Sequence, residues 1–357
     1  MKTRYVPLLL LLAACATRIP SEAGAGDPEL PPAAAPPPAV AEALVVRTES
    51  AAAPLPAGMA AAAQAPAPAP SPLPQLFVGA GDIAYCLKYT NNLYPAIYTG
   101  ILVRQLVAQF PATTVFTAGD NAYMFGTNVD FDGCYDPAWG FFKDKTRPVL
   151  GNHDYWIRDG AAYYNYFGAN AGPALRGYYS YDLGNWHIVA LNSNVPTDAA
   201  QLQWLQEDLN ASAKPCLAAV WHNPLFSSGQ NGQNPNDLGR KTNSFWNVLL
   251  QHKADVILNG HDHDYERFGP QNASGAADPN GIVEFIVGTG GAELSNPPPP
   301  GKSILPNSQV HFGNYGVLAM TLNASSYEWK FLCTQCTNNP PVLDPSPAPV
   351  PCHGATP

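Results

Sequence analysis

The chain has 357 residues, of which 46% are hydrophobic and 13% charged, so it can bury a sizeable core in one large or two small domains. Its formal net charge of −9 argues against a nucleic-acid binder, which would carry a basic stripe. The same charge disfavours any anionic ligand unless bound metal supplies positive charge.

The first fifteen residues are typical of an export signal. A short basic start precedes an apolar run, residues 6–12, that is too short to span a bilayer comfortably. The sequence Leu-Ala-Ala-Cys that ends at Cys15 resembles the bacterial lipobox, in which the cysteine is acylated and becomes the mature N-terminus. An ordinary signal peptide cleaved near Ala14 or Ala16 is the alternative. We expect export in both cases, and a lipid on Cys15 would anchor the chain to a membrane of the cell envelope (outer membrane or cell surface).

Composition divides the rest of the chain. Residues 16–74 are dominated by alanine and proline and are predicted to form a disordered tether, because such a segment cannot bury enough surface to offset its ordering entropy. Residues 75–339 are predicted to form one globular domain, and residues 340–357 a proline-rich tail.

Within the domain, short apolar runs typical of strands repeatedly end in polar or glycine-containing turns. In chain order these runs are 76–78, 114–117, 148–150, 186–191, 216–221 and 255–258, and a β-rich finish follows at 282–287, 317–322 and 327–332. Helices are predicted at 97–109, 201–211 and 243–252. Strands that alternate with helices predict an α/β sheet with its site at the strand ends.

Five of the strand-end turns carry side chains that can bind metal. They are GDIA (81–84), GDNAY (119–123), GNHD (151–154), AVWH (219–222) and GHDHDYER (260–267). A single Gly-Asp pair is most often only a turn, but five such turns in order, each after an apolar strand, are hard to explain in that way.

These ordered motifs resemble those of the calcineurin-like metallophosphoesterases, and Tyr123 with the HDYER run is similar to the purple acid phosphatases. The resemblance extends from Asp82 to Arg267. It implies a two-sheet β-sandwich core flanked by helices in α/β/β/α layers. It also implies hydrolysis of phosphate esters, with phosphomonoesters as the favoured substrates, by metal-bridged hydroxide at a dinuclear centre.

The resemblance further implies which residues hold two adjacent metal ions, with Asp120 bridging them. The first ion would be bound by Asp82, Asp120, Tyr123 and His263, and the second by Asp120, Asn152, His222 and His261. Carboxylate and phenolate oxygens suit Fe(III), whereas the mixed imidazole and amide set suits divalent Fe, Zn or Mn. The two ions would make the site cationic in an acidic protein.

Leaving-group protonation is where this chain departs from the family. Members commonly carry a histidine several residues after the fourth-motif histidine, but the loop 227–232 has none, and Asn231 cannot deliver a proton. His153 is the one motif histidine not assigned to metal. We predict that His153 acts catalytically beside the bridging Asp120 as the proton donor, oriented by Asp154.

Further polar residues are predicted to play supporting parts. Three aspartates flank the ligand candidates and are expected to orient ligand imidazoles: Asp154, Asp262 and Asp264. Glu266 and Arg267 are expected to form a structural ion pair, with a phosphate contact by Arg267 as the alternative. His187 is expected to be a satisfied core histidine.

Cysteine usage agrees with export. Apart from Cys15, the chain has Cys86, Cys134, Cys216, Cys333, Cys336 and Cys352, an even set that suggests disulfides. We predict that Cys86 pairs with Cys134 and that the last three cysteines contain a second bridge. The CxxC spacing of Cys333 and Cys336 is also compatible with a redox pair, half a zinc site or free thiols.

Three functions stay open on the sequence alone. The first is a phosphomonoesterase that acts on small-molecule phosphate esters, and the second is a phosphodiesterase or nucleotide-cleaving enzyme on the same scaffold. The third is a non-catalytic surface-binding lipoprotein, which is disfavoured because every ligand position is filled.

Overall fold

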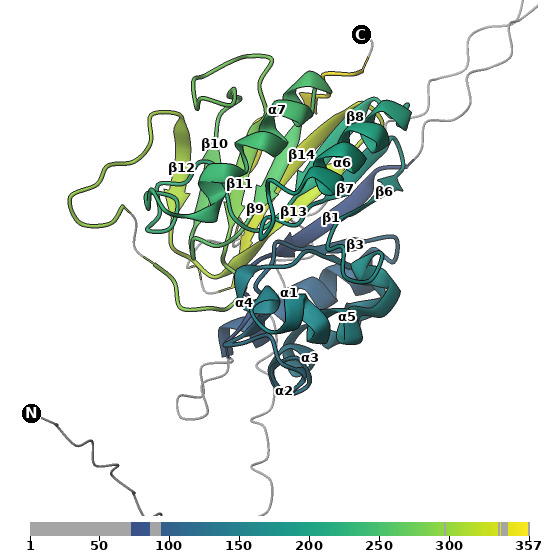
Figure 1. Cartoon of the computed structure of the whole chain (residues 1–357), viewed down its shortest axis with the longest axis vertical. Coiled ribbons are helices and arrows are strands. Elements are labelled where there is room, and N and C mark those ends of the chain that lie inside the picture. Colours follow the sequence, from purple (N-terminus) through teal and green to yellow (C-terminus); the bar gives the residue numbers. More distant parts are fainter. Residues whose placement is uncertain (1–72, 86–93, 296–297, 335, 337–341, 356–357) are drawn as a thin grey trace, which may run out of the picture. The chain divides into compact units, whose positions relative to one another are not determined.

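The computed structural model describes residues 73–85, 94–295, 298–334, 336 and 342–355 (Figure 1). The predicted signal segment, Cys15 and nearly all of the predicted tether lie outside these residues. Two mixed β-sheets and a small two-stranded sheet form the framework. Within the described residues, no helix is both long and apolar enough to cross a membrane.

The first large sheet combines an early parallel part with a late antiparallel part. Its order is β15-β14-β13-β1-β3-β5, with β16 also paired to β14. The strands are β1 (Gln75–Ala80), β3 (Thr114–Thr117), β5 (Thr146–Pro148), β13 (Gly316–Leu322), β14 (Ser326–Cys333), β15 (Val342–Leu343) and β16 (Val350–Pro351). Strands β1, β3 and β5 run parallel, and β13 joins β1 antiparallel.

The second large sheet has a parallel centre and antiparallel edges, in the order β12-β10-β11-β9-β8-β7-β6. Its strands are β6 (Tyr179–Leu183), β7 (Trp186–Ala190), β8 (Cys216–Val220), β9 (Val256–Asn259), β10 (Tyr265–Phe268), β11 (Val283–Val287) and β12 (Ser308–Phe312). The small sheet pairs β2 (Ala84–Tyr85) with β4 (Ala122–Tyr123). The pattern of apolar runs does not predict β6, β10 and β12, whose residues are less uniformly apolar.

Helices cover the outer faces of the two large sheets. The longer ones are α1 (Tyr94–Gln109), α6 (Ala199–Ala211) and α7 (Asn243–Gln251), which confirm the three predicted helices. The short ones are α2 (Asn128–Asp130), α3 (Asp136–Trp139), α4 (Asn152–Tyr155) and α5 (Ala161–Phe167). Tighter or wider turns of helix occupy η2 (Phe131–Tyr135), η3 (Gly140–Lys145), η4 (Arg158–Gly160), η5 (Gly168–Ala171) and η6 (Leu238–Lys241).

The layering follows from strands that are apolar on both faces. In β8, Ala218 and Val220 belong to the core cluster that is shared with the first sheet, whereas Leu217 and Ala219 belong to the cluster beneath α6 and α7. Successive strand residues point to opposite faces, so a wholly buried strand must be covered on both sides. The predicted α/β/β/α sandwich is therefore confirmed.

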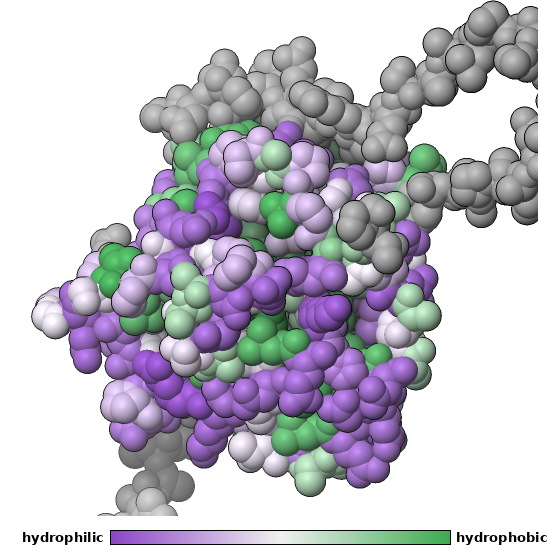
Figure 2. Space-filling model, turned by 90° about the horizontal axis from the view of Figure 1, so that it is seen from above, coloured by the Kyte–Doolittle hydropathy of each residue, from purple (hydrophilic) through white to green (hydrophobic). Residues whose placement is uncertain are grey.

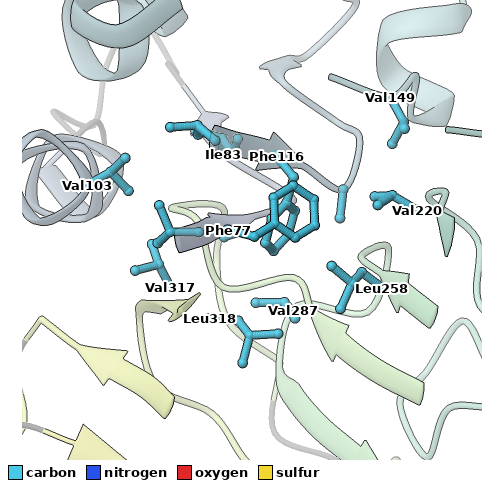
Figure 3. Close-up of a cluster of buried hydrophobic side chains, with 14 of the residues drawn as sticks. Phe77, Ile83, Val103, Phe116, Val149, Val220, Leu258, Val287, Val317 and Leu318 are labelled. Atoms are coloured by element: carbon cyan, nitrogen blue, oxygen red, sulfur yellow. The ribbon is translucent and has the colours of Figure 1, made fainter. Parts of the chain in front are cut away.

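The main core lies where the two sheets meet. Figure 3 shows Phe77 and Phe116 of the first sheet together with Val220, Leu258 and Val287 from the second, all of them buried. The rings of Phe77 and Phe116 lie 4.8 Å apart between centroids. The face drawn in Figure 2 is mostly hydrophilic with scattered hydrophobic residues, as expected of a protein surface.

The C-terminal segment is part of the sheet rather than a separate tail. Residues 342–355, which lie within the predicted proline-rich tail 340–357, add β15 and β16 to strand β14. A disulfide from Cys216 to Cys352 ties this segment to the second sheet, with the Cα atoms 5.3 Å apart.

The other cysteine predictions have different outcomes. Cys333 and Cys336 form a disulfide, which confirms the predicted bridge among the last three cysteines. The predicted pairing of Cys86 with Cys134 lies outside the described residues, because Cys86 is not among them.

Candidate metal centre

The strand-end motifs converge at one place in the fold. Asp82 follows β1, Asp120 follows β3, His222 follows β8 and His261 follows β9, while Asn152 begins α4. Because parallel strands that end in turns place those turns at one edge, residues distant in sequence reach a common centre.

Unusual backbone geometry presents three of these side chains. Asp82, Asp120 and His261 have φ angles of 57°, 49° and 74°, in the left-handed region that non-glycine residues seldom adopt. Strain of this kind collects at functional sites, where the surrounding structure holds it in place.

Glycines in the motifs make room for ligand candidates of neighbouring motifs. A Cβ atom on Gly151 would collide with the Asp120 carboxylate, and one on Gly260 would collide with the carboxylate of Asp82. The recurrent glycine before the ligand position is therefore a packing requirement of the site.

The first group of donor atoms comprises Asp82, Tyr123 and His263. The Tyr123 hydroxyl donates to Asp82 Oδ1 at 2.7 Å and lies 3.1 Å from His263 Nε2. His263 Nε2 is 3.3 Å from the same carboxylate oxygen. These three atoms form a compact, oxygen-rich set.

The second group is centred on His222. His222 Nε2 lies 3.1 Å from Asn152 Oδ1, 3.3 Å from Asp120 Oδ2 and 3.2 Å from His261 Nδ1. Ligand atoms of Asp82, Asp120 and His222 all lie within 4.8 Å of one another, so the two groups adjoin. All seven predicted ligand residues therefore meet, which sequence order alone could not demonstrate.

Each histidine among the ligand candidates is oriented by a hydrogen bond to one of its ring nitrogens. His222 Nδ1 bonds to the carbonyl of Ala118 at 2.8 Å, and His263 Nδ1 to the carbonyl of Glu293 at 2.7 Å. His261 Nε2 instead meets the carboxylate of Asp237 at 2.8 Å. Such partners fix the ring and direct its free nitrogen towards a metal.

Asp237 is the site residue that the sequence reasoning missed. It lies in a loop before η6, in no motif, and is separated by 24 residues from the histidine that it contacts. Nothing in its sequence surroundings distinguishes it from other loop aspartates.

The ionisable groups of the centre shift one another's pKa values. Burial disfavours the charged form of His222, but the carboxylates of Asp120 and Asp82 outweigh burial and raise its pKa to about 10. Burial likewise opposes the charged form of His263, whose pKa is raised to about 9, chiefly by Asp82. Burial and the two carboxylates raise the pKa of Tyr123 well above its ordinary value.

This donor set fits two cations. Asp82 and Asp120 are buried carboxylates. Beside them, the raised pKa values keep protons on His222, His263 and Tyr123, and the same carboxylates would favour the positive charge of metal ions in place of those protons. One group is rich in oxygen and the other in imidazole, which matches the predicted division between a harder and a softer ion.

The flanking aspartates do not act as predicted. Asp154 accepts hydrogen bonds from the backbone amides of Asn121, Ala122 and Gly151, and so ties two motif loops together. Asp262 accepts from Ser227, Asn231 and Gly232, and Asp264 lies 3.4 Å from His311. The backbone bends through residues 261–264, and the hydrogen bonds that Asp262 accepts direct its carboxylate to the loop 227–232 instead of to the imidazoles that flank it.

The predicted Glu266–Arg267 pair is also wrong. Arg267 forms an ion pair with Asp344 at 2.7 Å, while Glu266 accepts hydrogen bonds from the backbone and hydroxyl of Ser228. The guanidinium group also lies over Trp329 at 5.0 Å, so it is engaged away from the centre and the phosphate-contact alternative finds no support.

His187 is a satisfied buried histidine, as predicted, with contacts to Asp182 and Asp208.

His153 borders the metal-ligand candidates without joining either group. Its backbone amide donates to Asp120 Oδ1 at 2.8 Å, and its Nε2 is 3.8 Å from Asp120 Oδ2. Its Nδ1 contacts the carbonyl of Met124 at 2.7 Å, so that carbonyl, rather than Asp154, orients the ring.

The loop without a histidine closes another side of the centre. Asn231 donates its side-chain amide to the carbonyl of His261 at 2.8 Å, and so supports a ligand candidate. A pocket of about 370 Å³ opens beside it. That pocket is lined by Tyr85, Gln230, Asn231, Asp262, His263, Glu293, Leu294 and Ser295.

All seven ligand candidates lie in the part of the chain that matches a family model. Residues 76–265 match the family model described as calcineurin-like phosphoesterase. The chain is 26% identical to purple acid phosphatase 15 of Arabidopsis thaliana over 240 residues, which cover 61% of this chain and 40% of that protein. It is 34% identical to purple acid phosphatase 21 of the same plant over 194 residues, which cover 48% and 44%.

Solved structures resemble the fold at lower identity. A purple acid phosphatase from yellow lupin (Lupinus luteus) seeds superposes with a TM-score of 0.61 at 19% identity, covering 76% of this chain and 53% of that one. A dimetal phosphatase from Danio rerio gives 0.51 at 16% identity, covering 73% and 96%. The chain spans only 37% to 55% of the length of five Arabidopsis purple acid phosphatases that it matches.

Proposed function

Because the chain belongs to the calcineurin-like phosphoesterase family, we propose that it hydrolyses phosphate esters, and phosphomonoesters first, at the centre formed by the five motifs. The observation that carries this proposal is the convergence of two adjoining donor groups, with Asp120 in contact with both His222 and the backbone of His153. Similarity to purple acid phosphatases supports the choice of phosphomonoesters.

The family uses dinuclear metal centres, and we assign the ligands as the two donor groups suggest. Asp82, Asp120, Tyr123 and His263 would hold Fe(III), and Asp120, Asn152, His222 and His261 would hold divalent Fe, Zn or Mn. Bound ions would supply a cationic centre for the phosphate and bring the pKa of water towards neutrality.

The chain's own residues then position the ester and move a proton. Met124 holds Nδ1 of His153, which leaves Nε2 directed to the Asp120 side of the centre. A protonated His153 can give that proton to the departing alcohol oxygen. The carbonyl groups of Ala118 and Glu293 and the carboxylate of Asp237 keep the ligand imidazoles from turning away.

The proposal is tested on the purified protein by metal analysis together with turnover of an aryl phosphomonoester and its bis-ester. We expect two metal ions per chain, faster hydrolysis of the monoester, and loss of activity in Asp120→Asn. A protein that binds no metal and cleaves neither ester would contradict the proposal, whereas preference for the bis-ester would assign a phosphodiesterase.

The visible absorption of the purified protein tests whether the first ion is Fe(III). A Tyr123 phenolate on Fe(III) gives a charge-transfer band in the visible, so the oxidised protein should be violet and Tyr123→Phe should bleach it. A colourless protein with two divalent ions at full occupancy would instead make this a phosphoesterase without iron.

We also propose that the protein is exported and anchored through a lipid on Cys15, as the sequence ending in Leu-Ala-Ala-Cys suggests. Cys15→Ser should abolish labelling by a fatty acid and release the protein from the membrane fraction. Unchanged labelling and unchanged membrane association would reject the anchor.

A further inference from the structure

Two large aromatic side chains are exposed next to His153. Trp156 is 65% exposed and Phe125 is 48% exposed, although side chains of this size usually bury most of their surface. Their ring centroids lie 5.7 Å apart in an edge-to-face arrangement. The Trp156 ring also lies 5.7 Å from the His153 ring.

These rings continue an aromatic series that starts at the metal-ligand candidates. Tyr123, a proposed ligand, lies 4.4 Å from the His153 ring, which in turn contacts Trp156 and through it Phe125. The series therefore leads from the centre, past the proposed proton donor, to solvent.

Both exposed rings stand on constrained backbone. The turn that follows Phe125 is closed by mutual hydrogen bonds between Thr127 and Asp130, and the amide of Gly126 donates to the carbonyl of Ala122 at 3.1 Å. Trp156 directly follows the short helix α4, whose first residue is the ligand candidate Asn152. An exposed aromatic pair held in this way is preorganised to bind a ligand.

Resting on the proposed function, we propose that Trp156 and Phe125 form the subsite for the alcohol part of the ester, and that they select aromatic or other planar apolar alcohols. The oxygen that His153 protonates belongs to the departing alcohol. The carbon skeleton of that alcohol extends from this oxygen, and the first side chain beyond His153 in the aromatic series is Trp156. A planar ring would stack on these exposed faces, whereas a short alkyl group would leave them in water.

The test compares benzyl phosphate with ethyl phosphate on the metal-loaded protein. Both release an alkoxide that needs protonation, so only the ring distinguishes them. We expect a lower KM for benzyl phosphate, and we expect Trp156→Ala and Phe125→Ala each to reduce the preference for it by about three- to tenfold. Trp156→Phe should restore most of that preference.

Phe141→Ala is the matched control. Phe141 is 60% exposed and lies under the Arg104 guanidinium at 4.4 Å, so its removal deletes an exposed ring of the same kind elsewhere. The control should keep the wild-type preference. A wild-type protein without preference for benzyl phosphate, or Trp156→Ala and Phe125→Ala variants that lose both substrates equally, would overturn the subsite.

Binding of benzylphosphonate and ethylphosphonate, measured by calorimetry, separates the subsite from the chemistry. Tighter binding of benzylphosphonate that is lost in Trp156→Ala would support the subsite even if no ester were hydrolysed, in which case only the proposed function fails. Equal affinity for the two phosphonates would reject the subsite whatever the turnover.

Discussion

The hydrogen-bond partner of His261 sets it apart from the other two histidines among the ligand candidates. His222 and His263 meet neutral carbonyl groups, whereas His261 meets the carboxylate of Asp237, and both side chains of this pair are 12% exposed. Burial raises the pKa of Asp237, but the hydrogen bond and charge of His261 outweigh it and lower that pKa. A charged acceptor strengthens the electron-pair donation of an imidazole to metal, so we propose that Asp237 positions His261 for the second ion.

Asp237→Ala should therefore weaken the second metal site selectively. We expect its metal affinity to fall by about 10- to 100-fold, which is the usual effect of losing such a partner, while the first ion and its colour persist. Asp237→Asn should retain part of the affinity, because its amide oxygen still accepts the ring N–H. Metal titration followed by elemental analysis measures both.

Asp208→Asn is the control for that experiment, because it alters the carboxylate at His187, away from the centre. It should leave both metal affinities unchanged. Equal loss of both ions in Asp237→Ala would indicate general damage to the fold instead of a positioning role.

His153→Ala tests the proton donor. The variant should keep both metal ions, because His153 belongs to neither donor group, yet lose at least about tenfold in kcat on alkyl phosphates. Aryl phosphates with acidic leaving groups depart with less help and should lose less. Steady-state kinetics measure kcat on both substrate types. Equal losses of kcat on alkyl and aryl phosphates would reject the proton-donor role and leave His153 a positioning residue only.

At the scale of secondary-structure elements, two ion pairs of the buried His187 link a strand to its neighbouring strand and to a helix. His187 of β7 contacts Asp182 of β6 and Asp208 of α6, each at 2.8 Å. Burial lowers the pKa of His187, but the hydrogen bonds and charges of the two aspartates outweigh it and raise that pKa.

The two ion pairs of His187 predict how the free energy of unfolding depends on pH. Because the folded-state pKa of His187 is raised, its contribution is fully present below its ordinary pKa of about 6.5 and is lost as pH rises through the raised value. Hydrogen bonds to charged groups contribute about 1.5–3 kcal/mol, so His187→Gln should destabilise the protein by a similar amount at pH 6 and by less at pH 9. Chemical denaturation at both values measures this.

His252→Gln is the matched control, because His252 bonds to the neutral Gln206 and burial lowers its pKa. Its effect on stability should not shrink between pH 6 and pH 9. An equal cost of His187→Gln at both pH values would show that the imidazolium charge contributes nothing.

A second set of buried acids fixes the loop that lacks the family histidine. Glu266 accepts from the backbone amide of Ser228, and Asp262 accepts from the amides of Asn231 and Gly232. Glu284, which is also buried, accepts from the side-chain amide of Gln271. Burial and the neighbouring Glu266 raise the pKa of Glu284 well above its usual range. The carboxylates of Glu266 and Asp262 therefore accept the backbone amides of this loop and hold it in place.

At the scale of the whole domain, the Cys216–Cys352 disulfide joins segments 136 residues apart, whereas Cys333–Cys336 closes a separation of 3. In the chain-entropy description, a bridge of the first kind stabilises by about 4–5 kcal/mol and one of the second kind by about 2 kcal/mol. The double variant Cys216→Ala/Cys352→Ala should therefore lose clearly more stability than Cys333→Ala/Cys336→Ala, measured by denaturant unfolding. Equal losses would show that the length of the closed loop does not decide how much each bridge stabilises.

Much of the domain was predictable because its strands and helices carry local signals. Apolar runs that end in Gly-Asp, Gly-Asn-His and Gly-His turns indicate strands that deliver ligands, and helices such as 201–211 carry helical spacing. The family motifs extended this to the sandwich fold and to all seven ligand candidates, which the structure brings together.

The remaining features depend on contacts between residues distant in sequence. Asp237 contacts His261, and Arg267 forms its ion pair with Asp344 instead of with the adjacent Glu266. The disulfide of Cys352 attaches the last segment to the second sheet. Sequence by itself determined which residue types could bind metal and in what order, because ligand chemistry and strand periodicity are local properties. Only the tertiary structure decided which carboxylate orients which imidazole and which aromatic rings border the site, because those pairings depend on how separate loops pack in space.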